Sequence, residues 1–264
     1  DAVQVDLDAD LEEQEHHAEL GEQLHVLPRG DVPRRERRHD HTHGEEAEHA
    51  IHRHGKNEIE VIPVILEPVV GNMGCVPPAP GFLEGVRELC DRSGARLVFD
   101  EVTTGFRFCL GGAHLQYGVQ PDVAVFAKAL GSGHPIGAII GRVSTMQAAQ
   151  ETFISSTYWT EGVGTTAALA TIELCETQQI AAHVQQIGER FQLQCRRLAE
   201  RMQLPLNVGG YPALTTLTFA HPEAAALLTL FTVRMLQRGF LAGGAFYPTL
   251  AHTEQHLQAF AAAA

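Results

Sequence analysis

The sequence contains few cysteines and no long apolar run, and these absences exclude several classes of protein. The five cysteines are an odd number without a Cys-x-x-Cys pair, which argues against a disulfide framework or a zinc site and favours a reducing compartment. No apolar stretch approaches the roughly 18 residues that a membrane helix needs. The formal net charge of −13 argues against nucleic acid as a partner. Because the first residues are acidic, no secretory signal is expected, and we predict a cytoplasmic protein with no membrane or nucleic-acid partner.

Residues 1–56 contain no Phe, Trp or Tyr, and the first such residue in the chain is Phe82. The segment holds nine of the fifteen histidines among many charges. One interpretation is a metal-binding tail, because closely spaced histidines can ligate zinc, copper or nickel. A second is a solvated, mostly disordered extension. A third, which we prefer, is a non-native N-terminus produced by a fragment boundary or a misread frame. We therefore predict no metal site.

From residue 59 the pattern changes to alternating strands and helices. Ile59 to Leu66 is predicted as a strand that ends at Glu67 and Pro68. Residues 82–93 are predicted as a helix that ends at Ser93 and Gly94, with one apolar face formed by Phe82, Leu83, Val86, Leu89 and Cys90. Arg96 to Asp100 is the next strand. Such alternation predicts a parallel sheet, in which ligands bind beyond the carboxyl ends of the strands. Glu67 and Asp100 both fall at such ends.

An amine and a carboxylate follow two neighbouring strands of this predicted sheet. Asp100 ends one apolar strand, and Lys128 is the one charged residue in the apolar run 123–130, shortly before Gly131 and Gly133. A lysine that is costly to bury as a cation is favoured as a neutral, nucleophilic amine. Each residue has a simpler interpretation, since Asp100 could cap a turn and Lys128 could be a surface lysine at a strand end.

Three motifs in this region together resemble a known family. They are Glu-Pro-Val-Val-Gly-Asn-Met-Gly at 67–74, Asp-Glu-Val-Thr-Thr-Gly-Phe-Arg at 100–107, and the Lys128 segment. Their order and content resemble the class III, fold-type I aminotransferases that depend on pyridoxal phosphate (PLP), and within them the glutamate-1-semialdehyde aminomutase branch. The likeness runs from about Glu58 to Leu257. Three motifs in order are far more specific than a short glycine pattern.

The resemblance implies an α/β fold, namely the PLP-dependent transferase fold type I with a mostly parallel sheet and flanking helices. It divides the chain into an atypical segment (1–56), a partial PLP-binding large domain (57–180) and a small α+β C-terminal domain (181–264). In the last of these we expect a long helix from Ala181, a strand at 213–219, a helix at 222–238, and a final helix that carries Leu257 and Phe260. His252 is expected to be a structural histidine at the domain interface, and a ligand role is the less favoured alternative. The resemblance also implies a homodimer with shared active sites.

The resemblance implies the following site residues. Lys128 binds PLP as a Schiff base and moves a proton between the substrate and the cofactor, Asp100 pairs with the pyridinium nitrogen, and Val102 packs against the ring. Thr157 corresponds to a threonine that bonds the PLP phosphate of the neighbouring subunit, although Ser156, Thr157 or Thr160 could instead cap a helix. Glu67 and Asn72 complete the predicted cofactor-binding set, whereas Glu101 is expected to be structural.

The sequence departs from the family in two respects. The phosphate-binding cup and the ring-stacking aromatic of the family's upstream half are not found before Glu67, so the chain is expected to lack that half. Asn72 stands where many relatives acting on diamines or ω-amino substrates carry a glutamate, which favours the aminomutase-like branch. We predict an aminotransferase or aminomutase acting on an amino acid, amino-aldehyde or amino-sugar substrate with a carbonyl partner. The alternatives are a truncated, catalytically impaired relative and another PLP reaction such as racemisation.

Overall fold

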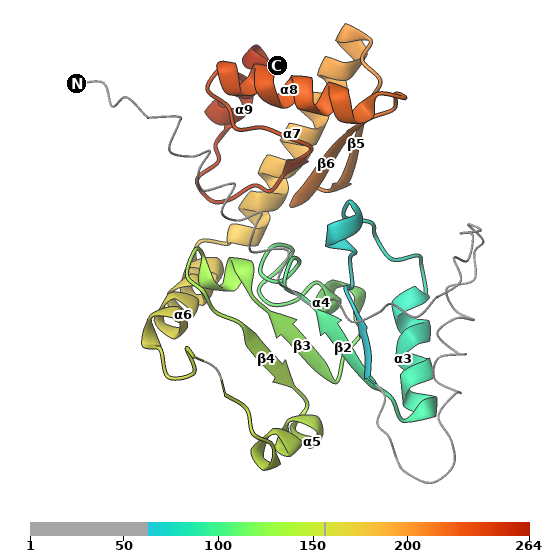
Figure 1. Ribbon diagram of the computed structural model, residues 1–264, viewed down its shortest axis with the longest axis vertical. Helices are drawn as coiled ribbons and strands as arrows, with labels where there is room; N and C mark the ends of the chain where they lie inside the picture. The colour runs from blue at the N-terminus through green and yellow to red at the C-terminus, as the bar shows by residue number, and fades with distance from the viewer. Residues whose placement is uncertain (1–62, 156) are drawn as a thin grey trace, which may run out of the picture. The chain divides into compact units, whose positions relative to one another are not determined.

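The computed structural model describes residues 63–155 and 157–264, which form two separate sheets with helices around them (Figure 1). Residues 1–56, with the three interpretations given above, lie outside the described residues. The first sheet has the strand order β1 (Pro63–Leu66), β2 (Arg96–Asp100), β3 (Val123–Phe126) and β4 (Ala138–Gly141). β1, β2 and β3 run parallel, and β4 is antiparallel to β3. The prediction of a mostly parallel sheet is confirmed.

Helix α3 (Phe82–Ser93) covers this sheet because its apolar residues recur on one side. Leu83, Val86 and Cys90 are buried and pack in one cluster with Leu97 and Phe99 of β2. The helix ends at Gly94, whose φ of 76° is a left-handed conformation that glycine adopts at no steric cost. Figure 1 shows α3 beside the strands it covers. The helix and its glycine end are therefore as the sequence predicted.

A buried carboxylate fixes the amino end of β3, opposite the end where Lys128 lies. Asp122 Oδ2 accepts the backbone N–H of Leu97 at 2.8 Å and the Arg87 guanidinium at 2.9 Å. Arg142 and Arg96 lie 3.6 and 3.9 Å from Oδ1. Burial by itself would raise the pKa of the Asp122 carboxyl, but the Leu97 N–H and the Arg87 guanidinium outweigh it and hold that pKa below its ordinary value.

We expect Asp122→Ala to lower the free energy of unfolding by about 3–5 kcal/mol, because it removes the buried acceptor of the largely buried Arg87 guanidinium and of the buried Leu97 N–H. Because the native pKa of Asp122 is depressed, its contribution is full above its ordinary value near ~3.9 and is lost as the pH falls through the native pKa. The free energy of unfolding, measured with urea at neutral and at acid pH, should therefore fall less between the two pH values in the variant than in the parent protein. Asp91→Ala, which removes the exposed partner of Arg87, should cost only about 0.5 kcal/mol. Equal effects of the two substitutions would contradict this account.

The second sheet is antiparallel and consists of β5 (Leu206–Tyr211), β6 (Leu214–Phe219) and β7 (Ala245–Phe246). The sequence predicted β6 but not β5, whose Asn207, Gly209 and Gly210 disfavour a strand by local preference. The hairpin forms because Leu206 and Val208 pack against the apolar side of α7 (Ile180–Met202).

Two further helices complete this part of the chain, α8 (Ala224–Gln237) and α9 (Glu254–Ala263). The periodicity of Leu257 and Phe260 predicted the last one. It begins with a reciprocal cap in which the Thr253 side chain bonds the helix backbone and the His256 side chain bonds the Thr253 backbone. Among the described residues, no helix is both long and apolar enough to cross a membrane.

Candidate functional site

The carboxyl ends of the three parallel strands bring together residues that are far apart in the sequence. Glu67 follows β1, Asp100 ends β2 in register with Val125, and Lys128 follows β3 by two residues. Because β1, β2 and β3 run in the same direction, these ends lie along one edge of the sheet. The expectation that the predicted acid and amine share that edge is met.

Lys128 lies at the start of a one-turn 3₁₀ helix (Lys128–Gly131) and has a φ of 48°. This left-handed conformation is uncommon for a residue other than glycine, costs on the order of 1–3 kcal/mol, and is found preferentially at functional sites. The Lys128 Nζ donates a hydrogen bond to Thr103 Oγ1 at 2.8 Å. Thr103 belongs to the turn after β2, so this contact joins the second and third strand ends.

The expected burial of Lys128 is wrong for this chain, because the residue is exposed. The tight turn after β3 explains the difference. The turn buries Leu130 and Gly131 and lifts the lysine out of the apolar run in which the sequence places it. The residue as a whole is therefore exposed among the described residues, while its amine takes part in a part-buried hydrogen bond with the Thr103 hydroxyl.

The loop after β1 approaches Thr103 closely at Gly71. The Glu67 carboxylate accepts the Gly71 N–H at 2.9 Å and the Asn72 side-chain amide at 3.3 Å. A Cβ at position 71 would come within 2.9 Å of Thr103 Cγ2 and 3.0 Å of Glu67 Oε2. A side chain at position 71 would therefore displace the threonine that holds Lys128, so this close approach requires glycine.

The Asp100 carboxylate uses one oxygen to hold its own turn. Its Oδ1 accepts the backbone N–H of Val102 at 2.9 Å, which is the turn-capping role weighed above. Its Oδ2 accepts no hydrogen bond from the described residues, and the side chain is half-buried. The capping role thus leaves one carboxylate oxygen available to a ligand.

The neighbouring Glu101 is fully buried and serves the fold. It accepts the backbone N–H groups of Ala113 and His114 at 2.9 Å, the His114 ring at 2.8 Å, and the Thr104 hydroxyl. Burial alone would raise its pKa, but these hydrogen bonds, that from the His114 ring first among them, outweigh burial and lower it. The structural role expected for Glu101 agrees with these contacts.

A cavity of about 470 Å³ opens beside Lys128 and is also lined by Arg107. Arg107 Nε donates to the Thr103 carbonyl at 2.9 Å, and its guanidinium lies 5.4 Å from the centre of the Tyr247 ring. Burial lowers the pKa of this guanidinium. Sequence reasoning assigned no role to Thr103 or Arg107, although both belong to the 100–107 motif. A search for polar side chains within that motif would have found them.

Thr157 lies apart from this cluster within one chain. It is exposed in a turn at 157–160 and makes no hydrogen bond to Lys128, Asp100 or Glu67 within the described residues. The following helix, α6 (Gly162–Thr177), is capped by Glu161, which accepts the N–H groups of Val163 at 2.6 Å and Gly164 at 3.0 Å. The alternative that Thr157 or Thr160 caps this helix is therefore wrong, because the carboxylate nearer the helix takes that role.

Comparisons with known proteins concern the family and the fold of the chain. The model of the family "Aminotransferase class-III" matches residues 9–261. A solved transaminase with PLP bound is 26% identical, with a TM-score of 0.69, and the match covers 76% of this chain and 50% of that one. The FumI protein of Sphingopyxis sp. MTA144 is 22% identical, with a TM-score of 0.72 and coverage of 76% and 50%. An ornithine aminotransferase of Plasmodium yoelii is 22% identical, with a TM-score of 0.66 and coverage of 75% and 55%.

These matches confirm the predicted fold class, the fold type I arrangement of an α/β sheet and its helices. The two matches at 22% identity speak for the fold alone. The chain spans about half the length of the solved structures it matches.

Proposed function

Because the chain belongs to the class III aminotransferase family, we propose that it is a PLP-dependent aminotransferase or aminomutase in which Lys128 binds the cofactor covalently. The observation that carries this proposal is the hydrogen bond from Lys128 Nζ to Thr103 Oγ1 at 2.8 Å. It ties the amine to the turn after β2, the same turn whose backbone the Asp100 carboxylate holds through the Val102 N–H.

The donor groups fit PLP in kind. The cofactor has an aldehyde that requires a primary amine and a ring nitrogen that requires a carboxylate. Lys128 supplies the amine, which within residues 63–155 and 157–264 donates its hydrogen bond to a neutral hydroxyl. Asp100 supplies a carboxylate with Oδ2 available among the described residues. When bound, the cofactor supplies an aldehyde that takes up the substrate amine and a ring that accepts the electrons released at the substrate α-carbon.

The residues of the chain then have distinct tasks. The Asp100 Oδ2 holds a proton on the ring nitrogen, while its Oδ1 stays on the Val102 N–H and fixes the carboxylate. With the cofactor bound, the Lys128 Nζ would act as the base that takes a proton from the substrate α-carbon and as the acid that delivers it to the former aldehyde carbon of the cofactor. The Thr103 hydroxyl positions that amine before the reaction and keeps it from swinging into solvent.

The other predicted residues complete the proposed site. We place Val102 against the ring, Glu67 and Asn72 at its border, and Thr157 at the phosphate of a second subunit in a homodimer. The exposure of Thr157 leaves it accessible to such a partner. The division into a large domain (57–180) and a small domain (181–264) remains a prediction, and so does a chain shortened in its N-terminal half.

We further propose that the chain belongs to the aminomutase-like branch of the family. Asn72 supports this, because it replaces a glutamate of the ω-amino branch and, through its amide, hydrogen-bonds Glu67 at 3.3 Å. The substrate would then be an amino acid, amino-aldehyde or amino sugar whose amine moves to a carbonyl carbon. Arg107, which lines the cavity that Lys128 also lines, makes that cavity cationic.

An amino-exchange assay tests the proposal. The protein loaded with PLP is given single amino acids and amino-aldehydes, and the formation of pyridoxamine phosphate is measured. At least one amine should convert the cofactor stoichiometrically. Loss of optical purity without pyridoxamine phosphate would indicate racemisation instead. Stable binding of PLP with no conversion by any amine would identify a catalytically impaired relative.

We expect Thr103→Val to slow turnover about 10–100-fold, the usual cost of losing one hydrogen bond to a charged group. Valine has nearly the shape of threonine but cannot accept the Lys128 hydrogen bond, so the amine loses its anchor. Thr103→Ser, which keeps the hydroxyl, is the matched control and should restore most of the rate. The initial rate of the amino-exchange assay is the measurement. Equal rates for the valine and serine variants would show that Thr103 does not position the amine.

A further inference from the structure

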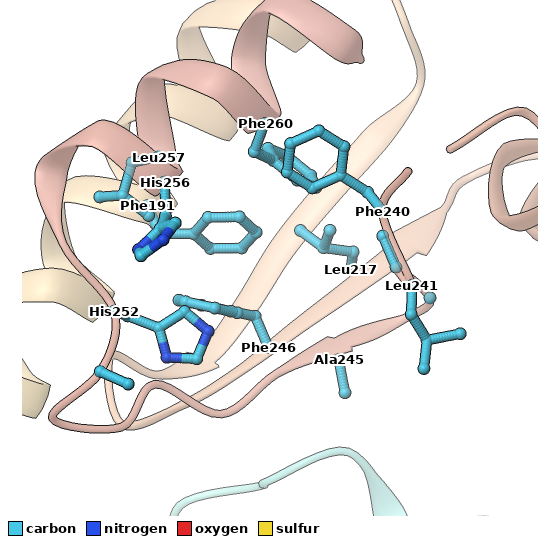
Figure 2. Close-up of a pocket in the computed structure, with 13 residues that line it drawn as sticks. Phe191, Leu217, Phe240, Leu241, Ala245, Phe246, His252, His256, Leu257 and Phe260 are labelled. Atoms are coloured by element: carbon cyan, nitrogen blue, oxygen red, sulfur yellow. The ribbon is translucent and has the colours of Figure 1, made fainter. Parts of the chain in front are cut away.

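A second cavity, of about 390 Å³, lies on the antiparallel sheet (Figure 2). It is lined by residues of α7, β6, β7 and α9, of the segment before β7, and of the segment between β7 and α9 that carries His252, and Lys128 and Asp100 are not among them. Figure 2 shows Phe191, Phe246 and Phe260 around its interior, with His252 and His256 side by side at one edge. Nothing in the proposed transamination uses this cavity.

The interior of the cavity is apolar and is built from the core. Phe191, Leu217 and Leu257 are buried members of the cluster that joins α7, β6 and α9. Phe191 lies 4.2 Å from Phe246 and 5.1 Å from Phe260 between ring centroids. The atoms that line an empty apolar space of this size lack van der Waals contacts on one side, and an apolar ligand would supply them. Its volume falls in the range of about 300–1,000 Å³ that is typical of small-molecule sites.

The two histidines line one edge of this apolar cavity with hydrogen-bond donors. His252 Nδ1 accepts the backbone N–H of Thr249 at 3.0 Å, and His256 Nδ1 accepts that of Thr253 at 3.1 Å. Because each Nδ1 accepts a hydrogen bond, the proton of each neutral ring is on Nε2. The two ring centroids are 6.3 Å apart. The edge therefore carries two N–H donors and no acceptor on either ring.

No carboxylate in the lining of the cavity would repel a negatively charged acceptor. Among the residues that line it there is no Asp, Glu, Lys or Arg. The nearest acid along α9, Glu254, is paired with Arg190 at 2.8 Å. A carboxylate has two oxygens that can each accept from one imidazole, and charge-assisted hydrogen bonds of this kind are stronger than neutral ones. An amine, by contrast, would find no acceptor on the two rings.

We propose that this cavity is a binding site for a small carboxylic acid with an aromatic or branched apolar body. The apolar body lies among Phe191, Phe246 and Phe260, and the carboxylate accepts hydrogen bonds from the Nε2 atoms of His252 and His256. Lys128 and Asp100 do not line this cavity, although Ala251 lines both cavities, so the site stands whether or not the chain transaminates.

Calorimetric titration of the full-length protein with 3-phenylpropionate tests the site, with 3-phenylpropan-1-ol as the neutral analogue. The acid should bind at least about tenfold more tightly than the alcohol, since the alcohol lacks the charge that strengthens the two hydrogen bonds. Equal affinities would overturn the carboxylate assignment. If the full chain binds neither probe, the proposal that this cavity is a binding site is contradicted.

Two variants locate the binding. His256→Glu keeps the helix cap, because Thr-x-x-Glu is itself a capping box, but replaces a donor with a like charge. It should weaken binding of the acid at least about tenfold, while His221→Glu, outside the cavity, should leave it unchanged.

Ala245→Phe places a ring in the cavity from β7 and should abolish binding of both probes. If that variant does not fold, His256→Glu still decides, since position 256 is exposed. Unchanged binding by His256→Glu would contradict the proposal.

Discussion

Lys128→Ala should reduce amino exchange to background, which is the largest effect expected for any substitution in this chain. The sequence has only two lysines, Lys56 and Lys128, and only Lys128 follows a strand of the described sheet. Alanine removes the amine that would bind the cofactor and move the proton, and nothing nearby can replace it. Thr103 would lose its hydrogen-bond donor but keep its place, because Gly71 packs against its methyl side.

The measurement is the rate of pyridoxamine phosphate formation by the variant protein after saturation with PLP. Lys56→Ala is the matched control and should keep the full rate. Since Lys128 is exposed, the alanine variant should fold as the parent protein does, which circular dichroism checks. Substantial exchange by Lys128→Ala would rule out the assigned role of this amine.

Asp100→Asn should lower turnover by several orders of magnitude with little effect on folding. Asparagine has the same shape, and its side-chain carbonyl can still accept the Val102 N–H that Oδ1 accepts now. It carries no negative charge, however, and so cannot hold a proton on a ring nitrogen, which removes the electron-accepting character of the cofactor.

A substitution at the next residue separates this effect from a structural one. Glu101→Gln removes the charge of a fully buried carboxylate that accepts hydrogen bonds from Ala113, His114 and Thr104. It should lower the free energy of unfolding, measured by urea titration, more than Asp100→Asn does. If Asp100→Asn lost stability and kept its rate per folded molecule, the catalytic role of Asp100 would be contradicted.

The sequence was sufficient to place Asp100 and Lys128 at one edge of the sheet, because that inference needs only the strand pattern and its parallel connections. The apolar runs at 96–100 and 123–126 are short and bounded, and the helix between residues 82 and 93 has one clear apolar side. These features depend on local sequence. The strand at 96–100 and the helix were predicted with nearly the bounds that the structure shows, whereas the apolar run predicted at 123–130 is a strand only over 123–126.

Other features depend on contacts between segments and could not be predicted in this way. The exposure of Lys128 follows from a tight turn with a left-handed residue, and β5 forms against α7 despite two glycines. The Thr103 contact joins residues 25 positions apart. The second cavity, lined by Phe191, Phe246, Phe260 and the two histidines, is likewise assembled from several segments of the C-terminal part of the chain. No single one of these segments predicts a ligand site by itself.

The most direct test of the central claim is reduction of the PLP-loaded protein with borohydride, followed by peptide mass mapping. Borohydride converts a carbon–nitrogen double bond to a stable amine, so it marks the lysine that holds the cofactor. The account predicts an absorbance band near ~420 nm that disappears on reduction, and a pyridoxyl mass on the peptide containing Lys128 alone. Labelling of Lys56, or of neither lysine, would contradict it.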